Sequence, residues 1–158
     1  MGIRIGIVGA GTTVAIADRH VEGFLAQEGR CTVAAVCSRT LEGCRRLCIR
    51  HGLDGVRMTT RLEELLDVVD AVVLCTPNQF HLPYTERAVE RGKAVLLEKP
   101  LGLQTAPPGQ AERLLARRGA RVMVAYVYRY TAVVGRLRAL LRQRMGRVYL
   151  AQASQGGT

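Results

Sequence analysis

Short apolar runs alternate along this chain with longer segments in which apolar side chains recur at helical spacing. The runs predict strands at residues 3–8, 32–37, 58–59, 71–75, 94–97 and 121–125. The intervening segments predict helices at residues 14–27, 41–51, 62–66, 82–90 and 107–118. Strands that alternate with helices pair in parallel, because each helix carries the chain back across the sheet. The sequence therefore predicts an α/β fold, doubly wound, with a mostly parallel six-stranded sheet.

The sequence predicts two domains, at residues 1–125 and 126–158. The six strands end by about residue 125, where a doubly wound sheet is complete. Beyond it, apolar residues from Val133 to Leu141 predict an amphipathic helix, and residues 147–154 predict one further strand. A single strand has no evident partner, so we expect a connecting helix and the first strand of an incomplete second domain. The unpaired edge of this predicted strand also predicts a homo-oligomer.

The size and hydropathy of the chain predict a soluble protein. A chain of 158 residues can bury one complete core. Apolar runs such as residues 3–8 and 71–75 are far too short to cross a bilayer, and the first ten residues lack the layout of a secretion signal. We therefore expect a cytoplasmic protein with no membrane partner.

The net charge of +10 comes mostly from arginine, since lysine occurs only at positions 93 and 99. A basic chain can bind nucleic acid through its phosphates. The arginines are scattered, however, and no recognition helix or aromatic RNA-binding motif accompanies them. We therefore interpret them as a solvated surface and do not expect a nucleic-acid partner.

The five cysteines include no CxxC pair, so the sequence indicates neither a disulfide framework nor a metal site. Cys44 and Cys48 share one face of a predicted helix. Thiols in that position are most simply buried apolar groups, and we expect them to be so.

In a doubly wound sheet the ligand lies beyond the carboxyl ends of the strands. After the first strand come Gly9 and Gly11, which permit a tight turn and let backbone amides approach a pyrophosphate. Thr12 and Thr13 follow them and are predicted to contact the same cofactor. The third glycine position of this motif is filled by Val14, or by the alanine after it if the loop is one residue longer. The alternative is a plain turn.

After the second strand come Ser38 and Arg39, where an acidic residue would bind the adenosine ribose. No carboxylate is present there to repel a 2′-phosphate, and Arg39 could pair with one. We therefore predict NADP rather than NAD, with Ser38 and Arg39 as cofactor-binding residues. The alternative is that Arg39 stacks on adenine or caps the next helix.

After the fourth strand come Thr76, Pro77, Asn78 and His81. Pro77 stiffens the turn, and Asn78 offers a donor and an acceptor to a ribose or a carboxamide. His81 opens the following helix, where a structural role competes with a functional one. We predict that all four residues contribute to the cofactor site.

After the fifth strand, an apolar run stops at Glu98, which Lys99 and Pro100 follow. Proline cannot continue a sheet ladder, so it forms a rigid turn that holds a cation at the end of the strand. Such a cation can stabilise negative charge on a reacting oxygen. The alternative is a surface lysine that caps a helix.

The segments GIVGAG, CTPNQFHLPYTERAVERGKAVLLEKPLG and AYVYRY, in this order, resemble the N-terminal half of the glucose–fructose oxidoreductase/inositol dehydrogenase/MocA family. The resemblance implies a Rossmann domain that binds NAD or NADP and acts on a sugar, cyclitol or related polyol. It implies that Lys99, with Glu98 beside it, lies at the nicotinamide and helps to bind or polarise the reacting hydroxyl or carbonyl. In such enzymes the bond from this lysine to the proline, here Pro100, is often cis. It also implies that Arg129 helps to shape this pocket, although Val127 stands where the family usually has asparagine.

Members of this family continue into a second α/β domain, which supplies most of the substrate pocket and often a catalytic histidine. The three histidines of this chain, His20, His51 and His81, do not match that histidine. We therefore expect a cofactor platform with Lys99 but without an evident general acid or base. The alternative function is a non-catalytic nucleotide-binding module.

Overall fold

The computed structural model describes residues 2–11, 16–103, 107–149 and 152. The strands are β1 (Ile3–Val8), β2 (Cys31–Cys37), β3 (Arg57–Thr59), β4 (Ala71–Leu74), β5 (Ala94–Leu97) and β6 (Val122–Val124). The α-helices are α1 (Ile16–Leu25), α2 (Leu41–His51), α3 (Leu62–Leu66), α4 (His81–Glu90), α5 (Gln110–Leu115) and α6 (Ala132–Gln143). Two 3₁₀ turns, η1 (Asn78–Phe80) and η2 (Val127–Tyr130), complete the described elements.

The strands form one six-stranded sheet in the order β3-β2-β1-β4-β5-β6, and every neighbouring pair is parallel. The chain starts in the middle, builds one half outward to β3, and then crosses back to build the other half from β4. This arrangement confirms the predicted doubly wound α/β fold. The strand order reverses between β1 and β4, which is where ligands bind in such sheets.

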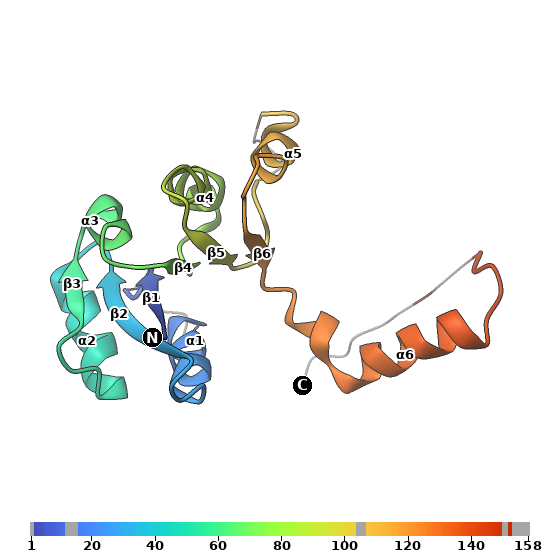
Figure 1. Ribbon diagram of the computed structural model, residues 1–158, viewed down its shortest axis with the longest axis horizontal. Helices are drawn as coiled ribbons and strands as arrows, with labels where there is room; N and C mark the ends of the chain where they lie inside the picture. Colours follow the sequence, from blue (N-terminus) through green and yellow to red (C-terminus); the bar gives the residue numbers. More distant parts are fainter. Residues whose placement is uncertain (1, 12–15, 104–106, 150–151, 153–158) are drawn as a thin grey trace. The chain divides into compact units, whose positions relative to one another are not determined.

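Two apolar clusters pack on opposite faces of the sheet because alternate side chains of a strand point to opposite sides. On β1, Ile5 and Ile7 join the cluster that contains side chains of α1 and α2. Val8 joins the other cluster, with Leu65 of α3 and Ala88 of α4. In Figure 1, α1 and α2 accordingly lie on one side of the strands, and α3 and α4 on the other.

The helix predicted at residues 107–118 is shorter in the structure, where α5 covers only Gln110–Leu115. Gly109 precedes it with a φ of +73°, a left-handed conformation that a helix cannot include. The proline-rich stretch before Gly109 therefore stays outside the helix. By contrast, α2 has the predicted bounds, because Thr40 caps its first turn and Gly52, in the left-handed region, ends it.

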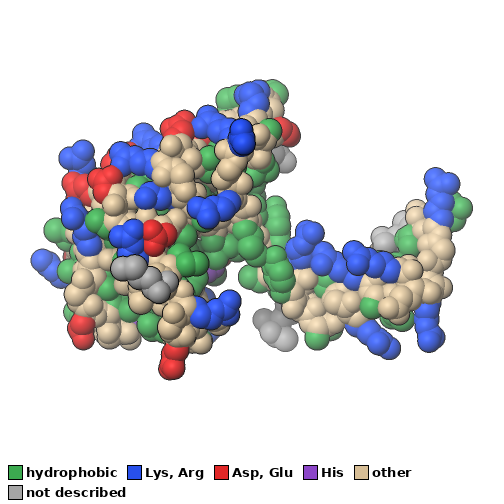
Figure 2. Space-filling view, in the orientation of Figure 1, with side chains coloured by type: hydrophobic (Ala, Val, Ile, Leu, Met, Phe, Trp, Pro, Cys, Tyr) green, Lys and Arg blue, Asp and Glu red, His purple; other side chains and the backbone are tan. Residues whose placement is uncertain are grey.

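The chain divides into two compact units, Met1–Ala125 and Tyr126–Thr158. In the second unit, Thr131 accepts a hydrogen bond from the Val134 amide and begins α6. Val133 and Leu137 of α6 are 78% and 51% exposed. Figure 2 shows Lys and Arg side chains over this helix and over the visible face of the first unit. The described elements of the second unit are therefore helical and carry exposed apolar side chains.

The strand predicted at residues 147–154 is not seen where the structure describes that stretch. Residues 147–149 are not in a strand, and the remainder lies outside the described residues, except for Gln152, which is not in a strand either. A strand needs a neighbour to receive its backbone hydrogen bonds, and none of the described strands extends to this part of the chain. Among the helices that the structure describes, none combines the length and the apolar character required to cross a bilayer.

Candidate functional site

Two pockets lie beyond the carboxyl ends of the strands and share one wall. Pocket A has a volume of about 290 Å³, and its lining includes Gly9, Gly11, Ser38, Arg39, Thr76 and Pro77. Pocket B has a volume of about 330 Å³, and its lining includes Thr76, Pro77, Asn78, His81, Glu98 and Lys99. Since Thr76 and Pro77 line both, the turn after β4 separates the two cavities. Pocket A lies at the end of β1 and β2 and beside β4, at the reversal of strand order.

The turn after β1 is one that only glycine can form. Gly9 has a φ of +105°, and a Cβ at this position would lie 2.5 Å from the carbonyl oxygen of Cys75. The amides of Gly9 and Ala10 both donate to the carbonyl oxygen of Cys37, at 2.9 and 3.4 Å. These two amides hold the turn against β2. Both amides are therefore already engaged within the sheet edge.

Ser38 is packed between two glycines. A Cβ on Gly11 would lie 2.4 Å from its Oγ, and a Cβ on Gly43 would lie 2.7 Å from the same atom. The loop after β1 thus approaches the first turn of α2 closely, with the Ser38 side chain buried between them. The sequence reasoning missed Gly43, whose signal is a glycine inside a predicted helix.

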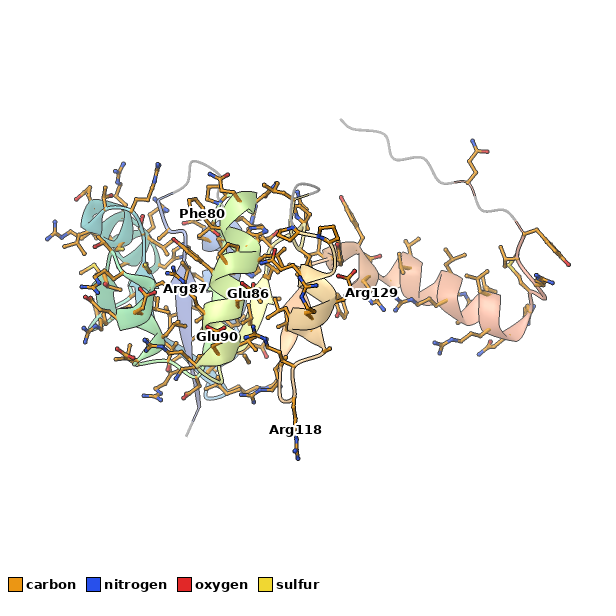
Figure 3. All side chains as sticks on the ribbon, turned by 90° about the horizontal axis from the view of Figure 1, so that it is seen from above. Phe80, Glu86, Arg87, Glu90, Arg118 and Arg129 are labelled. Carbon is orange, nitrogen blue, oxygen red and sulfur yellow. The ribbon has the colours of Figure 1, made fainter. Side chains whose placement is uncertain are left out.

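Arg39 lies at the mouth of pocket A with its side chain exposed. None of the described residues forms an ion pair with it, and no Asp or Glu belongs to the lining of this pocket. Two aromatic side chains, Phe80 and Tyr84, also line the pocket, and their ring centroids are 5.4 Å apart. Phe80 lies at the start of α4 (Figure 3). Pocket A therefore combines an aromatic wall with a cationic side chain, and the aromatic pair was not predicted.

Thr76, in the wall between the pockets, has a buried hydroxyl oxygen without a hydrogen-bond partner among the described residues. A buried polar atom that stays unpaired costs free energy, so a water molecule or a polar group of a ligand is expected to pair with it. The glycine turn, the unpaired hydroxyl and two adjoining cavities together fit an elongated, polar molecule that crosses the Thr76–Pro77 turn. A dinucleotide cofactor has this form.

Lys99 lines pocket B at the end of β5, with its side chain exposed. Its ammonium has no partner among the described residues, while its backbone amide donates to Oε2 of Glu98 at 3.3 Å. The peptide bond to Pro100 is cis, as the resemblance implies. Cys75 lies in the same pocket, and burial, followed by the charge of Glu98, raises the pKa of its thiol to about 12. Lys99 is therefore available to a ligand, whereas Cys75 stays an uncharged thiol.

All three histidines are engaged inside the first unit. His20 of α1 donates from Nε2 to Oε1 of Glu98 at 2.8 Å, a contact that sequence reasoning missed because 78 residues separate the two. His51 pairs through Nε2 with Asp18 at 2.8 Å. His81 is 1% exposed and lies between two backbone carbonyl oxygens. None of the three is a free acid or base facing pocket B.

For three predicted site residues the described structure gives no test. Thr12 and Thr13 lie outside the described residues, as does Val14. Arg129 lies in η2 of the second unit, with its side chain exposed. The remaining predicted residues, from the turns after four different strands, line pocket A or pocket B.

Comparison with known proteins identifies the family of this fold. Residues 3–126 match the model of an oxidoreductase family with an NAD-binding Rossmann fold, GFO_IDH_MocA. A dTDP-3,4-didehydro-2,6-dideoxy-alpha-D-glucose 3-reductase from Streptomyces violaceoruber is 35% identical over 135 residues, covering 83% of this chain and 38% of that protein. An inositol 2-dehydrogenase from Corynebacterium glutamicum is 32% identical over 101 residues, covering 63% of this chain and 28% of that protein.

Solved structures give the same fold. A 3-ketoreductase from Actinomadura kijaniata, in complex with NADP and TDP-benzene, superposes with a TM-score of 0.74 at 30% identity, over 90% of this chain and 43% of that one. A scyllo-inositol dehydrogenase from Lactobacillus casei with bound NAD(H) and scyllo-inositol has a TM-score of 0.78 at 22% identity, over 90% and 42%. The chain thus spans less than half the length of these relatives. On the match over residues 3–126, the chain belongs to the GFO/IDH/MocA oxidoreductase family, through its NAD-binding Rossmann domain.

Proposed function

We propose that this chain is the cofactor-binding part of an NAD(P)-dependent oxidoreductase that transfers hydride to or from a sugar, a cyclitol or a related polyol. The observation that carries the proposal is the pair of pockets on either side of the Thr76–Pro77 turn, one with the cation Arg39 and the other with Lys99. A nucleotide that crosses this turn would place its adenosine in pocket A and its nicotinamide in pocket B. The relatives named for sugar and inositol substrates support the substrate class.

Lys99 is the residue we propose to act on the reacting group. A bound nicotinamide supplies or accepts the hydride. The Lys99 ammonium, unpaired among the described residues, would donate a hydrogen bond to the substrate oxygen beside it. As a carbonyl becomes an alkoxide, negative charge grows on that oxygen, and a fixed cation stabilises the growing charge more than the starting state. Arg129 of the second unit is proposed to help shape the same end of the site.

We propose NADP as the preferred cofactor. A 2′-phosphate carries negative charge, and the lining of pocket A offers Arg39 and no carboxylate to oppose it. The guanidinium is exposed and has no ion-pair partner among the described residues, so it can bind a phosphate without breaking another pair. NAD remains the alternative, in which Arg39 would stack on the adenine.

A second candidate is a nucleotide-binding module without turnover of its own. The specific observation in its favour is that each histidine of the chain is held in an internal hydrogen bond. A general acid or base typically contributes about 100- to 10,000-fold to such reactions. Residues 126–158 are proposed to begin a substrate-binding domain that would supply this group.

Homodimer formation and a cytoplasmic location also stay predictions, the first testable by light scattering.

Titration of the protein with NADPH and NADH, followed by cofactor fluorescence, tests the proposal first. We expect binding of both, with NADPH tighter.

Turnover on a panel of sugars and cyclitols then distinguishes the enzyme from the module. In the enzyme, Lys99→Ala should lower turnover about 100-fold or more. Lys93→Ala is the matched control, because its ammonium donates to the carbonyl oxygen of Val69 instead, and it should leave turnover unchanged. If neither NADPH nor NADH binds, both proposed functions are contradicted.

A further inference from the structure

The residues on both sides of Lys99 are hydrogen-bonded to histidines that come from opposite faces of the sheet. Glu98 is bonded to His20 of α1, and Pro100 is bonded to His81 of α4. Helix α1 packs with the apolar cluster on one face, and α4 packs with the cluster on the other. The turn that carries Lys99 is therefore hydrogen-bonded to one histidine from the helices on each face of the sheet.

The contact with His20 is short and shielded from water. Nε2 donates to Oε1 of Glu98 at 2.8 Å, with side-chain exposures of 15% and 12%. The other carboxylate oxygen of Glu98 accepts from the backbone amide of Lys99 at 3.3 Å. The Glu98 amide in turn donates to the carbonyl oxygen of Leu74 at 3.0 Å. His20 thus fixes a carboxylate that itself holds the Lys99 backbone.

His81 joins the wall between the pockets to the Lys99 turn. Its Nδ1 lies 2.6 Å from the carbonyl oxygen of Pro100, and its Nε2 lies 2.9 Å from that of Thr76. Carbonyl oxygens only accept, so a ring nitrogen that carries a hydrogen donates to the carbonyl oxygen it faces. The Thr85 hydroxyl donates to the His81 carbonyl oxygen at 2.7 Å. One buried side chain therefore sets the distance between the two turns.

We propose that His20 and His81 are positioning residues for Lys99, acting through Glu98 and Pro100, which extends the role given to Lys99 in the proposed function. The Lys99 ammonium has no partner among the described residues, so the part of this lysine that the described structure constrains is the backbone that carries its flexible side chain. Polar groups at a reacting centre must be held within a fraction of an ångström to be effective. The two imidazoles supply that constraint through their contacts with Glu98 and Pro100.

The two lysines of this chain give a direct test. Selective ¹³C labelling of lysine yields side-chain NMR signals from Lys93 and Lys99 alone, assigned with Lys93→Arg. In His20→Ala and His81→Asn we expect the Lys99 signal to shift and the Lys93 signal to stay. NADPH affinity should also fall, by up to about tenfold, because the turn of Glu98 and Lys99 lines pocket B, where the nicotinamide is proposed to bind. His51→Gln is the control, since His51 pairs with Asp18 and lines neither pocket.

A conservative replacement separates positioning from packing. His20→Gln keeps an N–H donor for Glu98 and should recover most of the lost affinity and the Lys99 signal. An unmoved Lys99 signal in His20→Ala, or a His20→Gln that is no better than His20→Ala, would overturn the proposal. If His81→Asn does not fold, the His20 series decides. If the unaltered protein binds neither NADPH nor NADH, the proposed function fails, yet the Lys99 signal still tests the two histidines without cofactor.

Discussion

The turn after β1 depends on the absence of a side chain at Gly9. Its φ of +105° lies where side chains are rarely tolerated, and the carbonyl oxygen of Cys75 occupies the space of a Cβ. The same turn receives its shape from two amides that donate to Cys37. Because the turn forms part of pocket A, a change at Gly9 should affect both stability and binding.

Gly9→Ala should therefore lower the free energy of unfolding by about 2 kcal/mol or more and weaken NADPH binding. The matched control is Gly29→Ala, at a φ of +71° with no atom within 4 Å of the added Cβ. It carries the backbone strain alone and should cost about 1 kcal/mol. Urea unfolding and a fluorescence titration measure both variants. If both variants lower the free energy of unfolding equally, the close contact between the added Cβ and Cys75 would contribute no destabilisation.

Arg39 provides the test of cofactor preference. Arg39→Ala should weaken NADPH binding about tenfold or more and NADH binding less than about threefold, because a charge-assisted hydrogen bond to phosphate is lost only with NADPH. Arg45→Ala, which removes a guanidinium paired with Glu42 on α2, controls for the change in net charge. Fluorescence titrations of both cofactors give the ratio. A similar loss for NADPH and NADH would favour adenine stacking by Arg39.

The sequence was informative about residues that follow strands and uninformative about residues that meet through space. Lys99 and Arg39 could be predicted to lie near a ligand because each comes directly after a strand of a parallel sheet. The pairing of His20 with Glu98 links residues 78 positions apart, and no local pattern encodes it. Gly43 carried a local signal, a glycine within a helix, but not the identity of its neighbour Ser38.

At the scale of elements, Asp18 connects α1 to α2. Its carboxylate accepts from Nε and Nη2 of Arg50, at 2.8 and 3.2 Å, and from Nε2 of His51 at 2.8 Å. Burial raises the pKa of this carboxyl, but the bonds from Arg50 and His51 outweigh it, and the net pKa is lowered. A lowered pKa means that the folded protein favours the charged form, so the bridge stabilises the fold wherever Asp18 is ionised.

Asp18→Asn should therefore lower the free energy of unfolding by about 1 kcal/mol at pH 7. The stabilisation by Asp18 is complete above the unfolded pKa of about 4 and is lost as pH falls through the lower folded value. Urea unfolding should show a smaller difference between the two proteins near pH 3 than at pH 5. Glu22→Gln, which breaks an exposed pair with Arg19, should change little at any pH. A difference that grows between pH 5 and pH 3 would contradict this account.

The elements that sequence reasoning predicted well are those whose limits are set locally. Thr40 and Gly52 fix α2 by capping, and both are readable from sequence. The predicted strand at residues 147–154 depends on a partner strand, which apolar alternation alone cannot supply. The left-handed conformation of Gly109, which delays α5, becomes visible only in the folded backbone. Periodicity therefore gave the order of the elements, and caps or partners decided their extent.

At the scale of the whole molecule, the two compact units differ in how they are stabilised. All the buried apolar side chains of the described residues lie within the first unit, from Ile5 to Ala125. The second unit exposes Val133 and Leu137 and contains no acidic residue against its six arginines. Both pockets are lined entirely by residues of the first unit. Folding and cofactor binding should therefore depend chiefly on residues 1–125.

A chain ending at Ala125 should fold by itself, with a thermal midpoint within a few degrees of that of residues 1–158, since no buried apolar side chain among the described residues is removed. Circular dichroism and a thermal scan measure this. Arg129 is the one predicted site residue lost, so any decrease in NADPH affinity should equal that of Arg129→Ala in the full chain. A shortened chain that fails to fold would mean that the second unit contributes to the core. A loss of affinity well beyond that of Arg129→Ala would mean that other residues after Ala125 hold the cofactor.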